Sequence, residues 1–232
     1  MRRISVVIPS RNIENLNACT GRVRTFDPGL RIIAVDDGLS EAVQCAFVVP
    51  GVKPFIFARN VNIGIRAAGD DDIIILNDDA LLHHDPQDGG PGGFTILQRA
   101  AEEHPEYGLI ASTCNNVGNP NQQRRPDWHP HGFGLREDPR MVCFVCVFIP
   151  RRTIDAVGLL DERFVGYGMD DDDYCLRVRN AGLKIGIHDG CYVDHGSLKS
   201  SYRGAAGAGG DFQPNLKLFI EKWGVDNWGR PA

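Results

Sequence analysis

The sequence has 232 residues, which allows one large α/β domain or a compact domain with a small appendage. Charged residues make up 24% and hydrophobic residues 42% of it, as is typical of a globular protein with a sizeable core. The formal net charge of −5 argues against non-specific binding to nucleic acid, which relies on a basic face, and against a polybasic membrane anchor.

Targeting and membrane-spanning segments are not expected. The opening MRRISVVIPSRN has an apolar run that ends at Pro9, which is too short for a signal peptide. No apolar stretch reaches the ~18 residues that a transmembrane helix needs. The seven cysteines are an odd number scattered through apolar stretches, which favours a reduced, cytoplasmic chain. Cys143 and Cys146 form a lone C-x-x-C among bulky apolar residues, so buried strand thiols are favoured over zinc ligands.

Short apolar runs alternate with polar stretches in the first half of the chain. Runs rich in β-branched residues predict strands at residues 4–8, 31–35, 53–58 and 72–76. The polar stretch 15–24 is a candidate crossover helix. Such buried runs separated by crossovers predict an α/β fold with a mainly parallel central sheet flanked by helices.

The second half mixes loops, helices and further strands. Helical spacing or strand-like runs predict these elements in order: a helix at 94–104, a strand at 141–149, a helix at 170–181, a strand at 190–193 and a helix at 214–223. The last helix is expected to pack back through Leu218, Phe219 and Trp223. Residues 85–93 and 115–139 are expected to be loops, and the longer one suits a lid or a binding loop.

Polar residues follow three of the predicted strands. These segments are Pro9-Ser10-Arg11-Asn12, Asp36-Asp37-Gly38 and Asn77-Asp78-Asp79. Turn chemistry could explain any one of them. All three lie at the carboxyl edge of the sheet, where ligands of such folds bind, so together they predict a site. The third segment suits Mg²⁺ or Mn²⁺, and a diphosphate-bearing substrate would complete the coordination of the ion.

A run of four acids, Asp170 to Asp173, begins the predicted helix at 170–181. Acids favour a helix N-terminus, and Asp170 and Asp173 stand in N-cap to N3 relation, with Asp173 facing Arg177 four residues on. Successive helical residues point ~100° apart, so Asp171 and Asp172 face elsewhere. These two are the candidate cleft carboxylates, with Asp171 preferred as general base.

Two histidine segments add weaker signals. His195 follows the predicted strand at 190–193 and is either structural or an additional ligand for Mn²⁺. His129 and His131 are expected to be loop residues beside Trp128, whose ring could stack on a sugar acceptor.

Taken together, these segments resemble glycosyltransferases of the GT-A fold, most closely family 2. ISVVIPSRN and IIAVDDGLS are similar to the two nucleotide-binding strands of that family, and Asn62-Ile63-Gly64 with Arg66 to the segment before its metal strand. ILNDDALL resembles the DXD region, HGS the late metal-binding histidine region, and LFIEKWG a common C-terminal element. FVGYGMDDDDYCLRVRNAGLKI resembles both the acidic helix of family 2 and the Gly-Trp-Gly-Gly-Glu-Asp-Asp-Asp segment of β-1,4-galactosyltransferases.

The resemblance implies a metal-dependent, inverting transfer of a sugar from a nucleotide-sugar, UDP-sugar favoured, to a hydroxyl of a glycan or other acceptor. Asp171 would be the base, and Asp79 and His195 would hold Mn²⁺ or Mg²⁺. The implied donor contacts are Pro9, Ser10, Arg11, Asp37, Asn62, Arg66, Asn77 and Asp78, and the implied acceptor contacts are Asp172, Tyr167, Gly168 and Trp128. Asn77 replaces the first Asp of the metal motif, which would shift coordination onto Asp78, and Asp170 replaces the usual Glu.

The same resemblance implies a single GT-A domain over residues 1–199. Its nucleotide-sugar-binding half would be 1–82 and its acceptor-binding, catalytic half 83–199, followed by a Gly-rich segment and a C-terminal helix at 200–232. The Gly/Ala-rich stretch 204–210 is a lid or a plain linker. A pyrophosphorylase would carry a Gly-rich loop after the first strand and a nicotinamide dehydrogenase G-x-G-x-x-G, both of which are absent. A catalytically silent nucleotide- or glycan-binding module with the same fold is the alternative of a different class.

Overall fold

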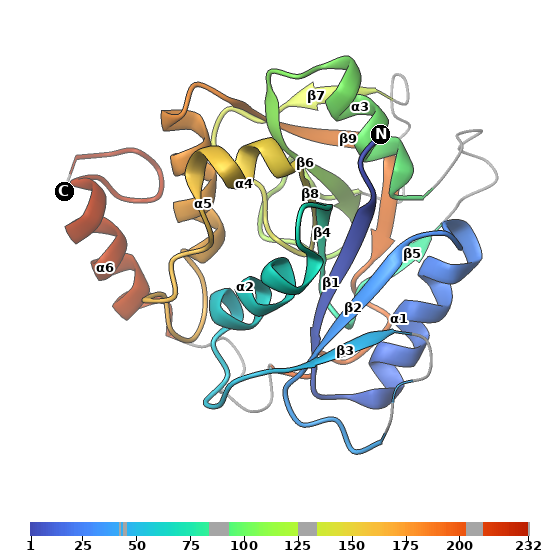
Figure 1. Cartoon of the computed structure of the whole chain (residues 1–232). Coiled ribbons are helices and arrows are strands. Elements are labelled where there is room, and N and C mark those ends of the chain that lie inside the picture. Colours follow the sequence, from blue (N-terminus) through green and yellow to red (C-terminus); the bar gives the residue numbers. More distant parts are fainter. Residues whose placement is uncertain (42, 44–45, 84–92, 125–133, 203–210, 232) are drawn as a thin grey trace.

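Parallel strands form the first half of a nine-stranded sheet. The computed structural model describes residues 1–41, 43, 46–83, 93–124, 134–202 and 211–231 (Figure 1). Strand β1 (Ile4–Ser10) lies between β2 (Arg31–Asp36) and β4 (Asp72–Leu76), and β3 (Phe47–Pro50) pairs with β2; all of these pairings are parallel. Their carboxyl ends therefore lie at one edge of the sheet.

Two crossover helices cover opposite faces of these strands. Helix α1 (Ile13–Phe26) packs on the face that carries Ile4, Val6 and Ile8, and its N-cap Asn12 accepts hydrogen bonds from two backbone amides of the first turn. Helix α2 (Phe57–Ala68) packs on the other face. A Cβ at Gly64 of α2 would lie 2.2 Å from a methyl carbon of Val7, so the close approach of this helix to β1 requires glycine.

The prediction of a strand at 53–58 is wrong. The third parallel strand is β3, and residues 57–68 form α2. The residues that α2 buries include Ala58, Val61, Ile65 and Ala68, which recur every three or four positions. This helical period outweighs the short apolar run that suggested a strand.

Antiparallel pairings make the second half of the sheet mixed. β8 (Cys146–Ile149) lies antiparallel between β4 and β6 (Tyr107–Cys114), and β6 pairs in parallel with β9 (Lys184–Asp194). β5 (Leu81–His83) and β7 (Leu135–Glu137) both pair antiparallel with β9. The expected α/β class with a helix-flanked central sheet is confirmed, with the consecutive parallel strands concentrated in the first half.

Two expected strands of the second half differ in extent, and one helix was not expected. The strand expected at 141–149 begins only at Cys146, so Cys143 lies in the irregular segment before the turn at 144–145. The strand expected at 190–193 is the end of the eleven-residue β9. Helix α4 (Arg151–Val157) had no sequence signal, whereas α3 (Thr95–Glu103), α5 (Asp170–Asn180) and α6 (Gln213–Trp223) lie where helices are predicted.

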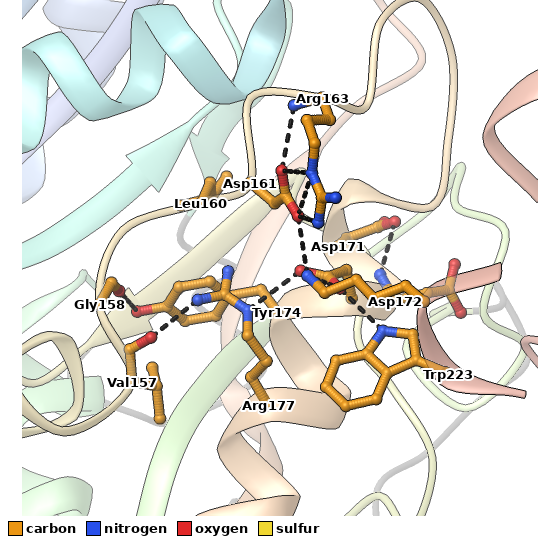
Figure 2. Close-up of polar contacts among 12 residues, drawn as sticks. Val157, Gly158, Leu160, Asp161, Arg163, Asp171, Asp172, Tyr174, Arg177 and Trp223 are labelled. Atoms are coloured by element: carbon orange, nitrogen blue, oxygen red, sulfur yellow. Dashed lines mark hydrogen bonds and ion pairs between the residues drawn. The ribbon is translucent and has the colours of Figure 1, made fainter. Parts of the chain in front are cut away.

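An ion-pair network holds α6 against α5 at the periphery of the molecule (Figures 1 and 2). The carboxylate of Asp173 has no exposed surface; it accepts hydrogen bonds from Arg177 Nε at 3.0 Å and Trp223 Nε1 at 2.9 Å, and Lys222 Nζ lies 2.7 Å away. Lys222 Nζ also donates to Asp161 at 2.8 Å. Phe219 packs with Phe164 and Met169, as expected of the terminal helix.

Among the described residues, no helix is both long and apolar enough to cross a membrane.

Replacing Lys222 by Met removes a cation from two carboxylates, of which Asp173 is fully buried. We expect a loss of about 2 kcal/mol in the free energy of unfolding, because a buried charged acceptor loses a partner. Urea unfolding at neutral pH measures the change. The control is Lys217→Met on the same helix, whose side chain is 80% exposed and which should change stability by less than about 0.5 kcal/mol. Equal effects of the two variants would contradict the role of the network.

Candidate active site

The carboxyl ends of β1, β2 and β4 meet through direct hydrogen bonds. Ser10 Oγ donates to the carboxylate of Asp78 at 2.7 Å, and the amide of Asp37 donates to the carbonyl of Ser10 at 2.8 Å. Asp78 is only 2% exposed. Burial raises the pKa of this carboxyl to about 6, although the Ser10 and Ser201 hydroxyls oppose the shift. The structure thus brings the three strand-end segments together.

The chain that follows β9 contacts the same carboxylate, that of Asp78. Ser201 Oγ donates to the carboxylate of Asp78 at 2.7 Å. The side-chain amide of Asn15, on α1, donates to the carbonyl of Lys199 at 2.9 Å and to Ser201 Oγ at 3.1 Å. The segment expected at 200–232, a Gly-rich stretch followed by a C-terminal helix, therefore begins inside the candidate site, whereas the stretch 204–210, predicted to be a lid or a linker, lies outside the described residues.

Asp79 and His195 form a buried pair beside Asp78. His195 Nε2 lies 3.2 Å from the Asp79 carboxylate, and the two residues are 9% and 5% exposed. His195 Nδ1 lies 2.7 Å from the carbonyl of Asn116. Because a carbonyl only accepts hydrogen bonds, Nδ1 carries the proton and Nε2 faces Asp79.

This pair fits a divalent cation. A metal-ligating histidine commonly donates its second ring N–H to a backbone carbonyl, as His195 does to Asn116. Among the described residues, no group of three or more His, Cys, Asp or Glu side chains is arranged to hold a metal. Mn²⁺ or Mg²⁺ at Asp79 and His195 would take its remaining ligands from water and a substrate diphosphate, as Mg²⁺ commonly does.

Asp37 and Arg11 line the approach to these strand ends. Asp37 is 3% exposed, and its Oδ1 makes no hydrogen bond within the described part of the chain. Burial raises the pKa of Asp37, against the opposing charges of Lys53 and Arg11. Arg11 is exposed beside an open pocket of about 340 Å³, which is lined by Arg11, Asn12, Ile13, Glu14, Ser40 and Ser201.

Other expected donor residues have structural partners. The Asn62 side chain, on α2, is buried and bonds to the backbone of Leu160 on both its donor and acceptor sides, and to Glu162. Arg66 lies 3.7 Å from Glu162. Neither side chain contacts the strand-end cluster in the described interactions. Pro9 is buried within β1, and the Asn77 side chain is partly exposed beside Asp78.

The acidic side chains at the start of α5 point in two directions. The helix begins at Asp170, after Met169 in a left-handed conformation with φ 72°, so the expected N-cap role of Asp170 is wrong. Asp173 does pair with Arg177, as predicted, but turns toward α6. Asp171 and Asp172 make separate contacts near the sheet.

Burial leaves the charges of Asp171 and Asp172 only partly compensated. The Asp171 carboxylate accepts hydrogen bonds from the amides of Asp172, at 3.0 Å, and Phe144. Asp172 lies 3.5 Å from Arg140 Nη1. Burial raises the pKa of both carboxyls, and the neighbouring Asp171 raises that of Asp172 further. A carboxyl with a raised pKa suits general-base chemistry near neutral pH.

Two consecutive residues connect the acids of α5 to the strand ends. The amide of Phe144 binds Asp171, and the carbonyl of Val145 accepts a hydrogen bond from the amide of Asn77 at 3.0 Å. Asn77 directly precedes Asp78 and Asp79. The candidate base and the candidate metal pair are therefore anchored to the same short segment.

The turn before α5 and the C-terminal turn flank the acids. The Asn215 side chain donates to the carbonyls of Tyr167 and Gly168 at 3.2 and 2.8 Å, and the Tyr167 side chain is exposed. Trp228, which is 62% exposed, lies with its ring 4.2 Å from the guanidinium of Arg140. Sequence reasoning missed Arg140, Trp228 and Ser201, because isolated residues in loops carry no periodic signal. Trp128, His129 and His131 lie outside the described residues.

Comparisons with known proteins agree with this architecture. No family model and no curated protein matches the sequence. The fold is that of the GT-A glycosyltransferases, which confirms the fold expected from the resemblance.

Three solved structures illustrate the likeness. The structure of GalNAc-T7 with UDP, GalNAc and Mn2+ matches with a TM-score of 0.67 and 13% identity over 84% of this chain and 44% of the GalNAc-T7 chain. Two structures of Drosophila β1,4-galactosyltransferase 7, one with xylobiose and one a mutant with manganese, UDP-Gal and xylobiose, match with a TM-score of 0.49 and 16% identity. They cover 87% of this chain and 68% of theirs. This chain thus spans less than half of the GalNAc-T7 chain.

Proposed function

We propose that this protein is a metal-dependent, inverting glycosyltransferase that moves a sugar from a nucleotide-sugar to an acceptor hydroxyl. The observation that carries the proposal is the presence of two groups of buried or partly buried acids near one edge of the sheet. Asp78 and Asp79 with His195 form one group, Asp171 and Asp172 form the other, and residues 144–145 connect them. A pyrophosphate-binding metal site beside a base of raised pKa suits glycosyl transfer.

The donor would bind across the ends of β1, β2 and β4. Asp37 and Arg11 would contact the nucleoside, and Asp79 and His195 would hold Mn²⁺ or Mg²⁺ against the diphosphate. When bound, the cation would neutralise the charge that develops on the leaving diphosphate. The UDP and Mn2+ named for the GalNAc-T7 structure support UDP as the favoured nucleotide. Hexosyl transfer, family 2 membership and a cytoplasmic location stay predictions.

Asp171 would act as the general base. Its carboxylate removes the proton of the acceptor hydroxyl while that oxygen attacks the anomeric carbon from the face opposite the nucleotide. The bond from the anomeric carbon to the diphosphate oxygen breaks, and its electron pair leaves with the nucleoside diphosphate. The backbone amides of Asp172 and Phe144 orient the carboxylate for this transfer.

The acceptor would lie over the N-terminus of α5. Asp172, held by Arg140, would accept a hydrogen bond from a second acceptor hydroxyl. Tyr167 and Gly168 would line the approach, and the exposed ring of Trp228 offers an apolar face for a sugar. A glycan acceptor fits this mixture of carboxylate, guanidinium and aromatic groups.

Metal-dependent donor binding tests the proposed metal pair. UDP with Mn²⁺ at 100 times its Kd should stabilise the protein by about 2.7 kcal/mol and raise Tm by roughly 5–10 °C. In Asp79→Asn, the part of the shift that depends on Mn²⁺ should disappear, because the cation loses an anionic ligand. The control is Asp70→Asn, an exposed acid in the turn before β4. A full Mn²⁺-dependent shift in Asp79→Asn would place the metal elsewhere.

Removing the base should abolish transfer and leave donor binding intact. We expect Asp171→Asn to lower kcat by about 10²- to 10⁴-fold. Asp155→Asn on α4, where the side chain is 57% exposed, is the control. If Asp171→Asn retained activity while Asp170→Asn or Asp172→Asn abolished it, the base would be assigned to the wrong carboxylate. Donor binding without turnover in the wild-type protein would favour the catalytically silent module.

The pH dependence of transfer reports on the same group. Burial raises the pKa of Asp171, so a larger fraction of this carboxyl is protonated at a given pH than in an exposed aspartate. A protonated carboxyl cannot act as a base. The rate should therefore fall on the acid side with a midpoint above the ordinary Asp pKa of about 3.9. A profile of kcat/KM against pH measures this midpoint, and a midpoint at or below 3.9 would contradict the assignment.

A further inference from the structure

Two aromatic rings stack beside the strand ends. The rings of Phe55 and Tyr202 lie with their centroids 3.9 Å apart and their planes 19° from parallel. Phe55 follows β3 in the loop that leads to α2, and Tyr202 follows Ser201, whose hydroxyl is bonded to Asp78. The stack therefore joins the loop after the edge strand to the segment that crosses the candidate donor site.

Tyr202 lies among the residues expected to bind the nucleoside. The guanidinium of Arg11 is 5.9 Å from the centre of the tyrosine ring. Burial raises the pKa of Tyr202, and the negative charges of Asp78 and Asp37 raise it further. The ring thus lies beside Arg11, which follows β1, and directly after Ser201, which is bonded to Asp78 at the end of β4.

Two buried polar atoms beside these strand ends make no hydrogen bond. Among the described residues, these atoms are the hydroxyl oxygen of Tyr202 and Oδ1 of Asp37, which is only 3% exposed. Burial raises the pKa of Asp37, and the buried side-chain amide of Asn60 is one of the protein groups that oppose this shift. Buried polar groups in folded proteins nearly always have partners, so a ligand that donates a hydrogen bond would complete the partners of the Asp37 carboxylate. A nucleoside offers such donors on its base and ribose, together with a flat ring.

We propose that Phe55 stacks on the nucleobase of the donor. We propose further that the ring of Tyr202 occupies the position of this nucleobase when no donor is bound. The inference rests on the proposed function, because it assigns the base-binding residue of that donor site. Donor binding then requires the Tyr202 ring to leave Phe55. The nucleobase then takes the place of the Tyr202 ring, and the carboxylate of Asp37 accepts a hydrogen bond from the nucleoside.

Competition between the ring and the base lowers the apparent affinity for the donor. When only a fraction of the protein has the base position open, the measured Kd is the intrinsic Kd divided by that fraction. Removing the competing ring should therefore tighten binding, whereas truncating a residue that contacts the donor would weaken it. The change in Kd therefore distinguishes a competing ring, whose removal lowers Kd, from a donor contact, whose removal raises it.

Isothermal titration of UDP, GDP and dTDP, each with Mn²⁺, tests the inference. We expect Tyr202→Ala to lower the Kd of the preferred nucleotide by about 2- to 12-fold, the range that an aromatic pair contributes. Tyr202→Phe, which keeps the ring, should bind no tighter than the wild type. In the Tyr202→Ala background, Phe55→Ala should raise Kd by about 5- to 100-fold through loss of base stacking. Phe47→Ala in that background is the matched control, since Phe47 is an exposed ring at the start of β3.

Two outcomes would overturn the inference without touching the proposed function. One is binding of the nucleotide by Tyr202→Ala with the same or a weaker affinity than the wild type. The other is equal loss of affinity in the Phe55 and Phe47 variants. Failure of the wild type and Tyr202→Ala to bind any nucleotide would instead overturn the proposed donor site and the inference together.

Discussion

The buried carboxylate of Asp78 is the contact on which the candidate donor site depends. It accepts hydrogen bonds from Ser10, at the end of β1, and from Ser201, which lies beyond β9. Segments that are far apart in the sequence therefore meet at one acceptor. Desolvation raises the pKa of Asp78 to about 6, so its two hydroxyl partners must be in place for the carboxylate to stay charged near neutral pH. The carboxylate of the adjacent Asp79 lies 3.2 Å from His195 Nε2.

The acids of α5 show how one run of like charges serves two purposes. Asp173 is fully buried, and its carboxylate is paired with Arg177, Lys222 and Trp223, so it stabilises the docking of α6. Asp171 and Asp172 have raised pKa values, because burial is not matched by full pairing. Successive side chains on a helix point ~100° apart. Asp173 can therefore stabilise the contact with α6, while Asp171 and Asp172 point elsewhere.

Local sequence patterns predicted part of this arrangement. The runs of β1, β2 and β4 and the acids that follow them were recognisable, because each depends only on neighbouring residues. The placement of β8 antiparallel to β4, and the contact of Ser201 with Asp78, arise from pairings between distant segments that leave no local pattern. The prediction of a strand at 53–58 is wrong because a six-residue apolar run does not distinguish a strand from a helix, whereas the buried positions of α2 recur with a helical period over twelve residues.

The stereochemistry of transfer tests the central claim most directly. The protein would be incubated with Mn²⁺, a panel of α-linked nucleotide-sugars and glycan acceptors, and the anomeric configuration of any product determined by NMR. The account predicts a β-linked product from an α-linked donor, formed with release of the nucleoside diphosphate, since a single displacement with Asp171 as the proposed base would invert the anomeric carbon. An α-linked product, or nucleotide binding without any transfer across the panel, would contradict it.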